Sequence, residues 1–172
     1  MGLFTDKQFD VIVIGVGSMG SATCYQLAKA GVRVLGLEQF DITHELGSHG
    51  GQSRIIRKAY FEHPDYVPLL VRAYENWRSL EEATGAQVYF KTGLIYAGRK
   101  EDVLMKGIRQ SAEAYNIRVD DLSSDDMEIR YPQFDIPAGY DILFEPDAGF
   151  VTPERAILLF TDEAIKKGAV IK

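Results

Sequence analysis

The sequence predicts an α/β fold, in which helices pack on a parallel sheet, together with a smaller portion of mixed strands and helices. Three observations lead to this prediction. An apolar run at residues 11–14 enters a glycine turn and then a helical pattern. A second apolar run at residues 32–37 follows Gly31, a natural C-terminal helix cap. A capped helix leading into a strand recurs at residues 152–171. Strand, crossover helix and strand form the unit from which parallel sheets are built.

The turn after the first strand has the pattern G-x-G-x-x-G, formed by Gly15, Gly17 and Gly20. The first glycine allows the turn, the second lets the backbone approach a pyrophosphate, and the third lets the helix pack close to the strand. Free amides and the helix dipole favour an anion there. Glu38 ends the second strand, where a dinucleotide site needs a carboxylate for ribose hydroxyls and where a 2′-phosphate would be repelled. The pattern predicts a dinucleotide site other than one for NADP. The alternative is an ordinary strand, turn and helix with an acid placed by chance.

The remaining elements follow from periodicity and from turn residues. The first helix places Met19, Thr23 and Leu27 at helical spacing, and Cys24 within it is expected to be a buried packing residue. Asp65 is a candidate cap for a long helix that ends by Gly85. Further helices are predicted around residues 104–115, from residue 124 and at 153–167, and strands at 88–90, 94–97, 118–122, 142–145, 149–151 and 169–171.

Composition is that of an ordinary globular protein. The chain has 172 residues, of which 46% are hydrophobic and 26% charged, enough for one well-buried domain and part of a second. The net charge of −6 does not favour nucleic acid as a partner. The single cysteine excludes an intramolecular disulfide and favours a reducing compartment. No apolar run reaches the roughly 18 residues of a membrane span, and the polar start at residues 1–8 predicts no signal peptide, so we expect a cytoplasmic protein.

A polar, glycine-rich loop at residues 39–52 follows the second strand and contains His44 and His49. A metal site is one interpretation of these two histidines. No cysteine lies near them and they share no tight ligand spacing, so solvated or loop-packing histidines are preferred and no metal is predicted.

Residues 53–57 are predicted to form a short strand that leaves this loop. Side chains alternate along a strand, so Arg54 and Arg57 are expected to point to opposite faces. From the residues alone, exposed arginines on an edge strand are the preferred interpretation.

The run from Gly47 to Tyr60, taken together with the glycine turn, resembles the N-terminal part of the sarcosine oxidase family. These flavoenzymes oxidise N-methyl or cyclic secondary amino acids and include N-methyltryptophan oxidase and pipecolate oxidase. One departure is Gly50 after His49, where the monomeric sarcosine oxidase pattern has a second histidine. The likeness covers essentially the whole chain and continues through residues 66–68, 91–93, 144–146 and 149–150.

The resemblance implies a Rossmann-like FAD-binding domain of the glutathione reductase type with part of an α+β substrate domain. The corresponding segments are residues 1–85 for FAD binding, 86–148 for the partial substrate domain and 149–172 for the return to the FAD domain. Arg54 would lie against the flavin, and Arg57 would hold the substrate carboxylate, for which a guanidinium fork is suited. The candidate catalytic residues are Arg54 and Arg57, and the candidate cofactor-binding residues are Gly15, Gly17, Ser18, Met19, Gly20, Glu38, Gln39, Gly47, Ser48, His49, Ser53 and Arg54.

The activity that the resemblance implies is oxidation of the C–N bond of a small amino acid to an imine, with O2 reduced to hydrogen peroxide. The alternatives are an FAD-dependent amino acid dehydrogenase or glycine oxidase, and a non-catalytic nucleotide-binding fragment. The chain stops on the first residues of a strand, so we interpret it as truncated. The family's flavin-tethering cysteine and its functional lysines would belong to sequence beyond residue 172. We expect this stretch alone to bind FAD weakly, to associate with itself and not to turn over.

Overall fold

The structure is a computed structural model that describes residues 8–172. The chain forms two compact units, each assembled from separate stretches. The expectation that residues 1–8 form no signal peptide concerns a stretch that lies almost wholly outside the described residues. Unit 1 contains the described residues up to Arg54 together with Leu80–Val88 and Val151–Lys172, and unit 2 contains Ile55–Ser79 and Tyr89–Phe150.

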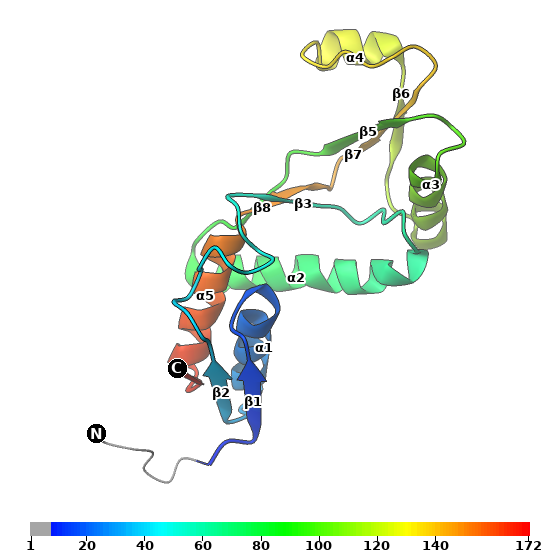
Figure 1. Cartoon of the computed structure of the whole chain (residues 1–172). Helices are drawn as coiled ribbons and strands as arrows, with labels where there is room; N and C mark the ends of the chain where they lie inside the picture. Colours follow the sequence, from blue (N-terminus) through cyan, green and yellow to red (C-terminus); the bar gives the residue numbers. More distant parts are fainter. Residues whose placement is uncertain (1–7) are drawn as a thin grey trace. The chain divides into compact units, whose positions relative to one another are not determined.

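Unit 1 is built on a parallel sheet of three strands in the order β1–β2–β9 (Figure 1). β1 is Val11–Ile14, β2 is Val34–Leu37 and β9 is Val170–Ile171. The first two strands pair in register from Val11 opposite Val34 to Ile14 opposite Leu37. Strands of a parallel sheet form near-continuous apolar runs, which explains why all three were visible in the sequence. The predicted α/β fold class is confirmed.

Two helices, α1 (Ser18–Lys29) and α5 (Pro153–Lys166), pack in unit 1. The ring of Tyr25 in α1 lies 5.5 Å from that of Phe160 in α5. A Cβ on Gly36 of β2 would lie 3.2 Å from the sulfur of Cys24, so glycine at this position lets α1 approach the sheet. Cys24 is fully buried, as predicted from its place in the helix.

The buried face of α1 differs from the stripe that the sequence suggested. Met19 and Thr23 are exposed, although they have helical spacing. The contacts with α5 and β2 decide which face is buried, because a 12-residue helix with apolar residues on several sides has no single preferred face. The residues that α1 buries are Ser21, Cys24, Tyr25 and Ala28.

The sheet of unit 1 exposes apolar side chains on the face turned away from α1. Leu35 and Leu37 flank Gly36 and therefore point away from this helix. Ile12 and Ile14 pair with them and share that face. Ile12, Ile14 and Leu37 are exposed. Exposed apolar side chains of this kind favour contact with another apolar surface.

Unit 2 contains one three-stranded sheet, a second one apart from its terminal residues Arg54 and Val151, and most of the remaining helices (Figure 1). The first sheet has the order β3–β8–β4, with β3 at Arg54–Ile56, β8 at Gly149–Val151 and β4 at Tyr89–Phe90. The second sheet is antiparallel and has the order β5–β7–β6, with β5 at Leu94–Gly98, β7 at Asp141–Glu145 and β6 at Asp120–Leu122. The helices are α2 (Val67–Thr84), whose last turn belongs to unit 1, α3 (Val103–Tyr115) and α4 (Ser124–Arg130).

The core of unit 2 lies between α3 and one face of the antiparallel sheet. Tyr96 of β5 pairs with Leu143 of β7, so both side chains point to the same face. Met105 and Ile108 lie one helical turn apart on α3 and pack against them. A Cβ on Gly107 would lie 2.1 Å from the carbonyl oxygen of Phe61, so close packing of α3 requires glycine there.

The start of the long helix differs from the sequence expectation. A short 3-10 helix, η1 (Pro64–Tyr66), precedes α2, and its cap is His63 rather than Asp65. The imidazole Nδ1 of His63 accepts a hydrogen bond from the amide of Asp65 at 3.2 Å. Pro64 has no amide to donate, so the first free amide is that of Asp65. Among the helices described between residues 8 and 172, none combines the length and apolar character that crossing a bilayer requires.

Removing the side chain of Leu143 tests the core of unit 2. Leu143 is fully buried in this core. We expect Leu143→Ala to lower the free energy of unfolding by about 2–5 kcal/mol. The substitution would leave a cavity that the surrounding core residues can fill only in part. Denaturant unfolding followed by circular dichroism measures this difference. The matched control is Val103→Ala, because Val103 is 76% exposed at the start of α3 and its truncation should change the value by no more than about 0.5 kcal/mol. Equal effects of the two variants would contradict this description of the core.

Candidate functional site

The candidate site of unit 1 begins at the turn between β1 and α1. Gly15 has φ +85°, a conformation that favours glycine, and its amide donates to the carbonyl oxygen of Leu37 at 2.7 Å. A Cβ on Gly20 would lie 1.8 Å from the carbonyl oxygen of Gly15, so the first turn of α1 rests directly on the loop. Gly17 caps α1 without a side-chain hydrogen bond. The amides of the first helical turn are therefore not covered by a capping side chain and can donate hydrogen bonds to an anion.

The carboxylate of Glu38 ties the end of β2 to this turn. Its Oε2 accepts from the amide of Val16 at 2.7 Å, and its Oε1 accepts from the amides of Gln39 at 2.9 Å and Phe40 at 3.3 Å. These bonds, the one from Val16 above all, together with the imidazole of His44, lower the pKa of Glu38 below its ordinary value despite burial. Glu38 therefore stays ionised at neutral pH.

Two histidines of the loop lie beside this carboxylate. Nδ1 of His44 accepts from the amide of Leu46 at 3.0 Å, and its Nε2 lies 3.3 Å from Oε1 of Glu38. The ring of His49 lies 5.6 Å from that of His44 and is buried, with the residue only 5% exposed. Nε2 of His49 has no hydrogen-bond partner among residues 8–172. A buried nitrogen of this kind has bonding capacity left for a ligand.

A pocket with a volume of about 490 Å³ lies over these groups, within the usual size range of small-molecule sites. The structure brings most of the predicted cofactor-binding residues together in its wall. Sequence reasoning missed five other residues of the wall. The predicted residues that line it are Gly15, Gly17, Ser18, Met19, Gly20, Glu38, Gly47, Ser48 and His49, and the missed ones are Val13, Ile14, Thr23, Phe40 and His44.

A sequence signal existed for some of the missed residues. Thr23 follows Met19 by one helical turn, and its hydroxyl donates to the carbonyl oxygen of Met19 at 2.8 Å. The helical spacing that suggested a buried stripe marks instead the side of α1 that borders the pocket. For His44 there was no such signal, because its contact with Glu38 depends on how the loop folds back.

Three predicted cofactor-binding residues do not line this pocket. Gln39 lies in the wall of a neighbouring hollow that shares Phe40 and His44 with it. Ser53 is exposed, and its carbonyl oxygen accepts from Nη1 of Arg54 at 3.1 Å. Nη2 of Arg54 donates to the carbonyl oxygen of Gly50, so this guanidinium folds back on its own loop.

The second predicted catalytic residue, Arg57, belongs to unit 2 and follows the end of β3. Its guanidinium carbon lies 4.9 Å from the ring centre of Tyr60 and 5.4 Å from that of Phe61. Nη2 makes long hydrogen bonds of 3.3 and 3.5 Å to the carboxylate of Glu62. Nε of Arg57 is buried and has no partner within the described part of the chain. The guanidinium therefore has donors available for an anion.

These features define the class of protein. A parallel sheet, a glycine turn that leads into a helix, and a carboxylate at the end of the second strand are the parts of a dinucleotide-binding α/β domain. The pocket lies at the carboxyl ends of β1 and β2, where such sheets bind ligands.

Comparison with known proteins identifies the family. Residues 10–172 match the FAD dependent oxidoreductase family (DAO), and the chain belongs to it. FAD is the cofactor of this family. The chain is 41% identical over 164 residues to monomeric sarcosine oxidase from Bacillus sp. (strain B-0618), covering 95% of this chain and 42% of that protein. It is 37% identical over 149 residues to N-methyl-L-tryptophan oxidase from Yersinia pestis (strain Pestoides F), covering 87% of this chain and 40% of that protein.

Solved structures agree with this assignment. NikD, described as an unusual amino acid oxidase essential for nikkomycin biosynthesis, matches with a TM-score of 0.81 and 27% identity over 95% of this chain and 42% of its own. L-proline dehydrogenase from P. horikoshii shares the fold, with a TM-score of 0.79 at 23% identity over 96% of this chain and 44% of its own. The chain thus spans less than half the length of the relatives that it matches.

The lowered pKa of Glu38 predicts a pH dependence of stability. Because the pKa in the folded state lies below the unfolded value of about 4.3, the carboxylate contributes stability above that pH, and this contribution is lost as the pH falls through the folded-state pKa. We expect Glu38→Gln to be less stable than the wild type at neutral pH, with a difference that shrinks below about pH 4.3. Denaturant unfolding between about pH 7 and pH 3 measures it.

The matched control for this experiment is Glu82→Gln, which makes the same change at an exposed position of α2. We expect this variant to show no comparable pH-dependent difference. A constant difference between the wild type and Glu38→Gln over the whole pH range would contradict the role of the ionised Glu38 carboxylate.

Proposed function

We propose that the protein carrying this chain is an FAD-dependent amine oxidase. It oxidises the C–N bond of a small N-methyl or cyclic secondary amino acid to an imine and passes the electrons to O2. The observation that carries this proposal is the pocket over the start of α1, which gathers the glycine turn, Glu38 and His49. The names of the relatives at 41% and 37% identity support an N-methyl amino acid as the substrate.

The residues of the pocket fit the nucleotide part of FAD. The uncovered amides after Gly17 suit the pyrophosphate. Oε2 of Glu38 accepts one protein hydrogen bond, from Val16, which leaves capacity for a ribose hydroxyl. Nε2 of His49 is buried without a protein partner among residues 8–172 and suits a polar atom of the nucleotide. Bound FAD would accept an electron pair from the substrate. The residues of the pocket would hold and orient the FAD.

Arg57 is suited to binding the substrate carboxylate. Its side chain is 23% exposed and lies over two aromatic rings, which shield it from water. Its present partner, Glu62, is more exposed and is held only by long bonds. An incoming carboxylate can therefore replace Glu62 and also use the unpaired Nε, which makes a bidentate contact.

The proposed function predicts which nucleotide the pocket binds. We expect FAD to bind more tightly than NAD, and Glu38→Ala to weaken FAD binding by about 1.5–3 kcal/mol, because a charged acceptor for a ribose hydroxyl is lost. Titration calorimetry measures both affinities. Glu82→Ala, at an exposed position of α2, is the control and should bind FAD as the wild type does. NAD binding as tight as FAD binding would contradict the proposal that this pocket binds FAD.

The second prediction concerns Arg57 and uses the holoenzyme that carries this chain, assayed by peroxide release from sarcosine. We expect Arg57→Ala to raise KM about 100-fold or more while FAD binding changes little, because the substrate anion would be buried without a partner. Arg54→Ala should instead alter the absorption spectrum of the flavin.

Arg118→Ala is the control for charge removal in unit 2, because Arg118 forms an exposed ion pair with Asp120. We expect its KM to equal that of the wild type. A wild-type KM in Arg57→Ala would remove Arg57 from the substrate site. Turnover with a dye acceptor but without peroxide would overturn the assignment of O2.

A further inference from the structure

We propose that Glu145 is a positioning residue for Arg57, which it holds in place by binding the backbone that follows Arg57. This inference rests on the proposed function, in which Arg57 binds the substrate carboxylate. Both residues belong to unit 2.

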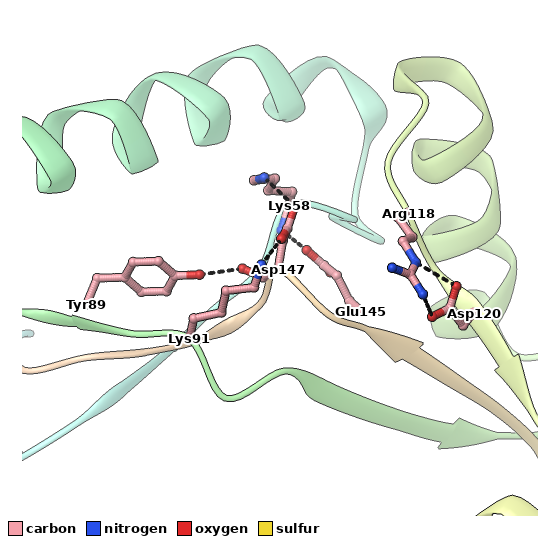
Figure 2. Close-up of polar contacts among 7 residues, drawn as sticks. All are labelled: Lys58, Tyr89, Lys91, Arg118, Asp120, Glu145 and Asp147. Carbon is pink, nitrogen blue, oxygen red and sulfur yellow. Dashed lines mark hydrogen bonds and ion pairs between the residues drawn. The ribbon is translucent and has the colours of Figure 1, made fainter.

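Glu145 is the last residue of β7 and is 0% exposed. Its Oε1 accepts from the amide of Lys58 at 2.7 Å, and its Oε2 accepts from the amide of Ala59 at 3.3 Å. The amide of Lys58 is part of the peptide bond that joins Arg57 to Lys58. Figure 2 shows the Glu145 side chain directed at Lys58. The carboxylate therefore binds the peptide group that joins Arg57 to Lys58.

Tyr96 completes the set of donors around this carboxylate. Its hydroxyl donates to Oε2 of Glu145 at 2.7 Å. Burial, followed by the charge of Glu145, raises the pKa of Tyr96, so the hydroxyl keeps its proton and remains a donor. Three donors thus meet one buried carboxylate, which offsets the cost of removing its charge from water.

The side chain of Lys58 provides a second anchor. Its Nζ lies 3.1 Å from Oδ2 of Asp147, whose Oδ1 lies 2.5 Å from Nζ of Lys91 (Figure 2). The hydroxyl of Tyr89 donates to the carbonyl oxygen of Asp147 at 2.7 Å. Lys91 and then Lys58 lower the pKa of Asp147, which keeps this acceptor ionised. Residue 58 is therefore fixed through both its backbone and its side chain, which restricts the backbone of Arg57 next to it.

The two backbone amides at this contact need an acceptor at both oxygens, which a carboxylate provides. All three groups that face Glu145 act as donors, and an ionised carboxylate is a side chain that accepts at both oxygens and donates at neither. In Glu145→Gln one oxygen becomes an NH2 group, which cannot accept from a backbone amide. Because an amide occupies the same volume, this variant shifts the segment that carries Arg57 without opening a cavity.

The test uses Glu145→Gln in the holoenzyme. We expect KM for sarcosine to rise about 10- to 100-fold, because a small displacement of a positioning group is costly, while kcat changes much less. Calorimetric titration with acetate should show a matching loss of affinity for a simple carboxylate. Asp120→Asn makes the same acid-to-amide change in the neighbouring strand β6, where Asp120 pairs with Arg118 at 2.9 Å (Figure 2), and should leave both values unchanged.

A double-mutant cycle separates positioning from general stability. If Glu145 acts through Arg57, adding Glu145→Gln to Arg57→Ala causes no further rise in KM and no further loss of acetate affinity. Additive effects of the two changes would overturn the inference. If Arg57→Ala raises KM and Glu145→Gln alone does not, the positioning role fails and the proposed function stands. If Arg57→Ala leaves KM unchanged, the proposed role of Arg57 fails first.

If Glu145→Gln does not fold, Tyr96→Phe tests the positioning role of Glu145. This variant removes the donor that orients Oε2 of Glu145, the oxygen that also accepts from the amide of Ala59, so the backbone contact is weakened while the carboxylate keeps its charge. A raised KM for sarcosine with a nearly unchanged kcat supports the positioning role. A KM equal to that of the wild type in a folded Tyr96→Phe protein overturns it.

Discussion

The hydrogen bond between the Glu38 carboxylate and the amide of Val16 is the interaction on which the candidate nucleotide pocket depends. It joins the end of β2 to the turn that follows β1, at an oxygen-to-nitrogen distance of 2.7 Å. The amide of Gly15 donates to Leu37 beside it, so the ends of the two strands are tied together twice. The carboxyl ends of neighbouring parallel strands meet at one edge of a sheet, and the uncovered amides of α1 open at the same edge. The Glu38 carboxylate thereby holds the turn and places a negative charge at this edge of the pocket.

Unit 2 uses a carboxylate in the same way. Glu145 is the last residue of β7 and Glu38 directly follows β2. Each accepts a hydrogen bond from a backbone amide far away in the sequence, that of Lys58 and that of Val16 respectively. A buried charge is costly unless donors surround it, and in both places backbone amides are the donors. Amides belong to the chain itself, so the bond orders a segment and not only a side chain. In unit 1 the ordered segment is the glycine turn, and in unit 2 it is the stretch that follows Arg57.

The two carboxylate contacts, of Glu38 and of Glu145, fit the two binding tasks of a flavin-dependent oxidation. One part of the molecule must hold a dinucleotide by its phosphates and ribose, which calls for amides and a carboxylate. The other must hold a small anionic substrate, which calls for a guanidinium with donors to spare. In the proposed function Arg57 has this role, because aromatic rings lie against its guanidinium and Glu62 holds it only through long bonds. Membership of the FAD dependent oxidoreductase family is consistent with both.

The sequence by itself determined the helices, the strands and the glycine turn. The spacing of apolar residues and glycines is a local property, and it sets the local secondary structure. It therefore predicted the β1–α1–β2 unit, the glycine-turn side of the pocket wall and the acid at position 38, whereas Gly47, Ser48 and His49 followed from the family resemblance. Tertiary structure decided the rest. It selected the face of α1 that holds Cys24 in place of the one that holds Met19, since contacts with α5 and β2 settle which side is buried. It brought His44 to Glu38 through the fold of a loop. It also joined Glu145 to Lys58 across 87 residues of chain. No local pattern encodes such a pairing, because it exists only when distant strands pack together.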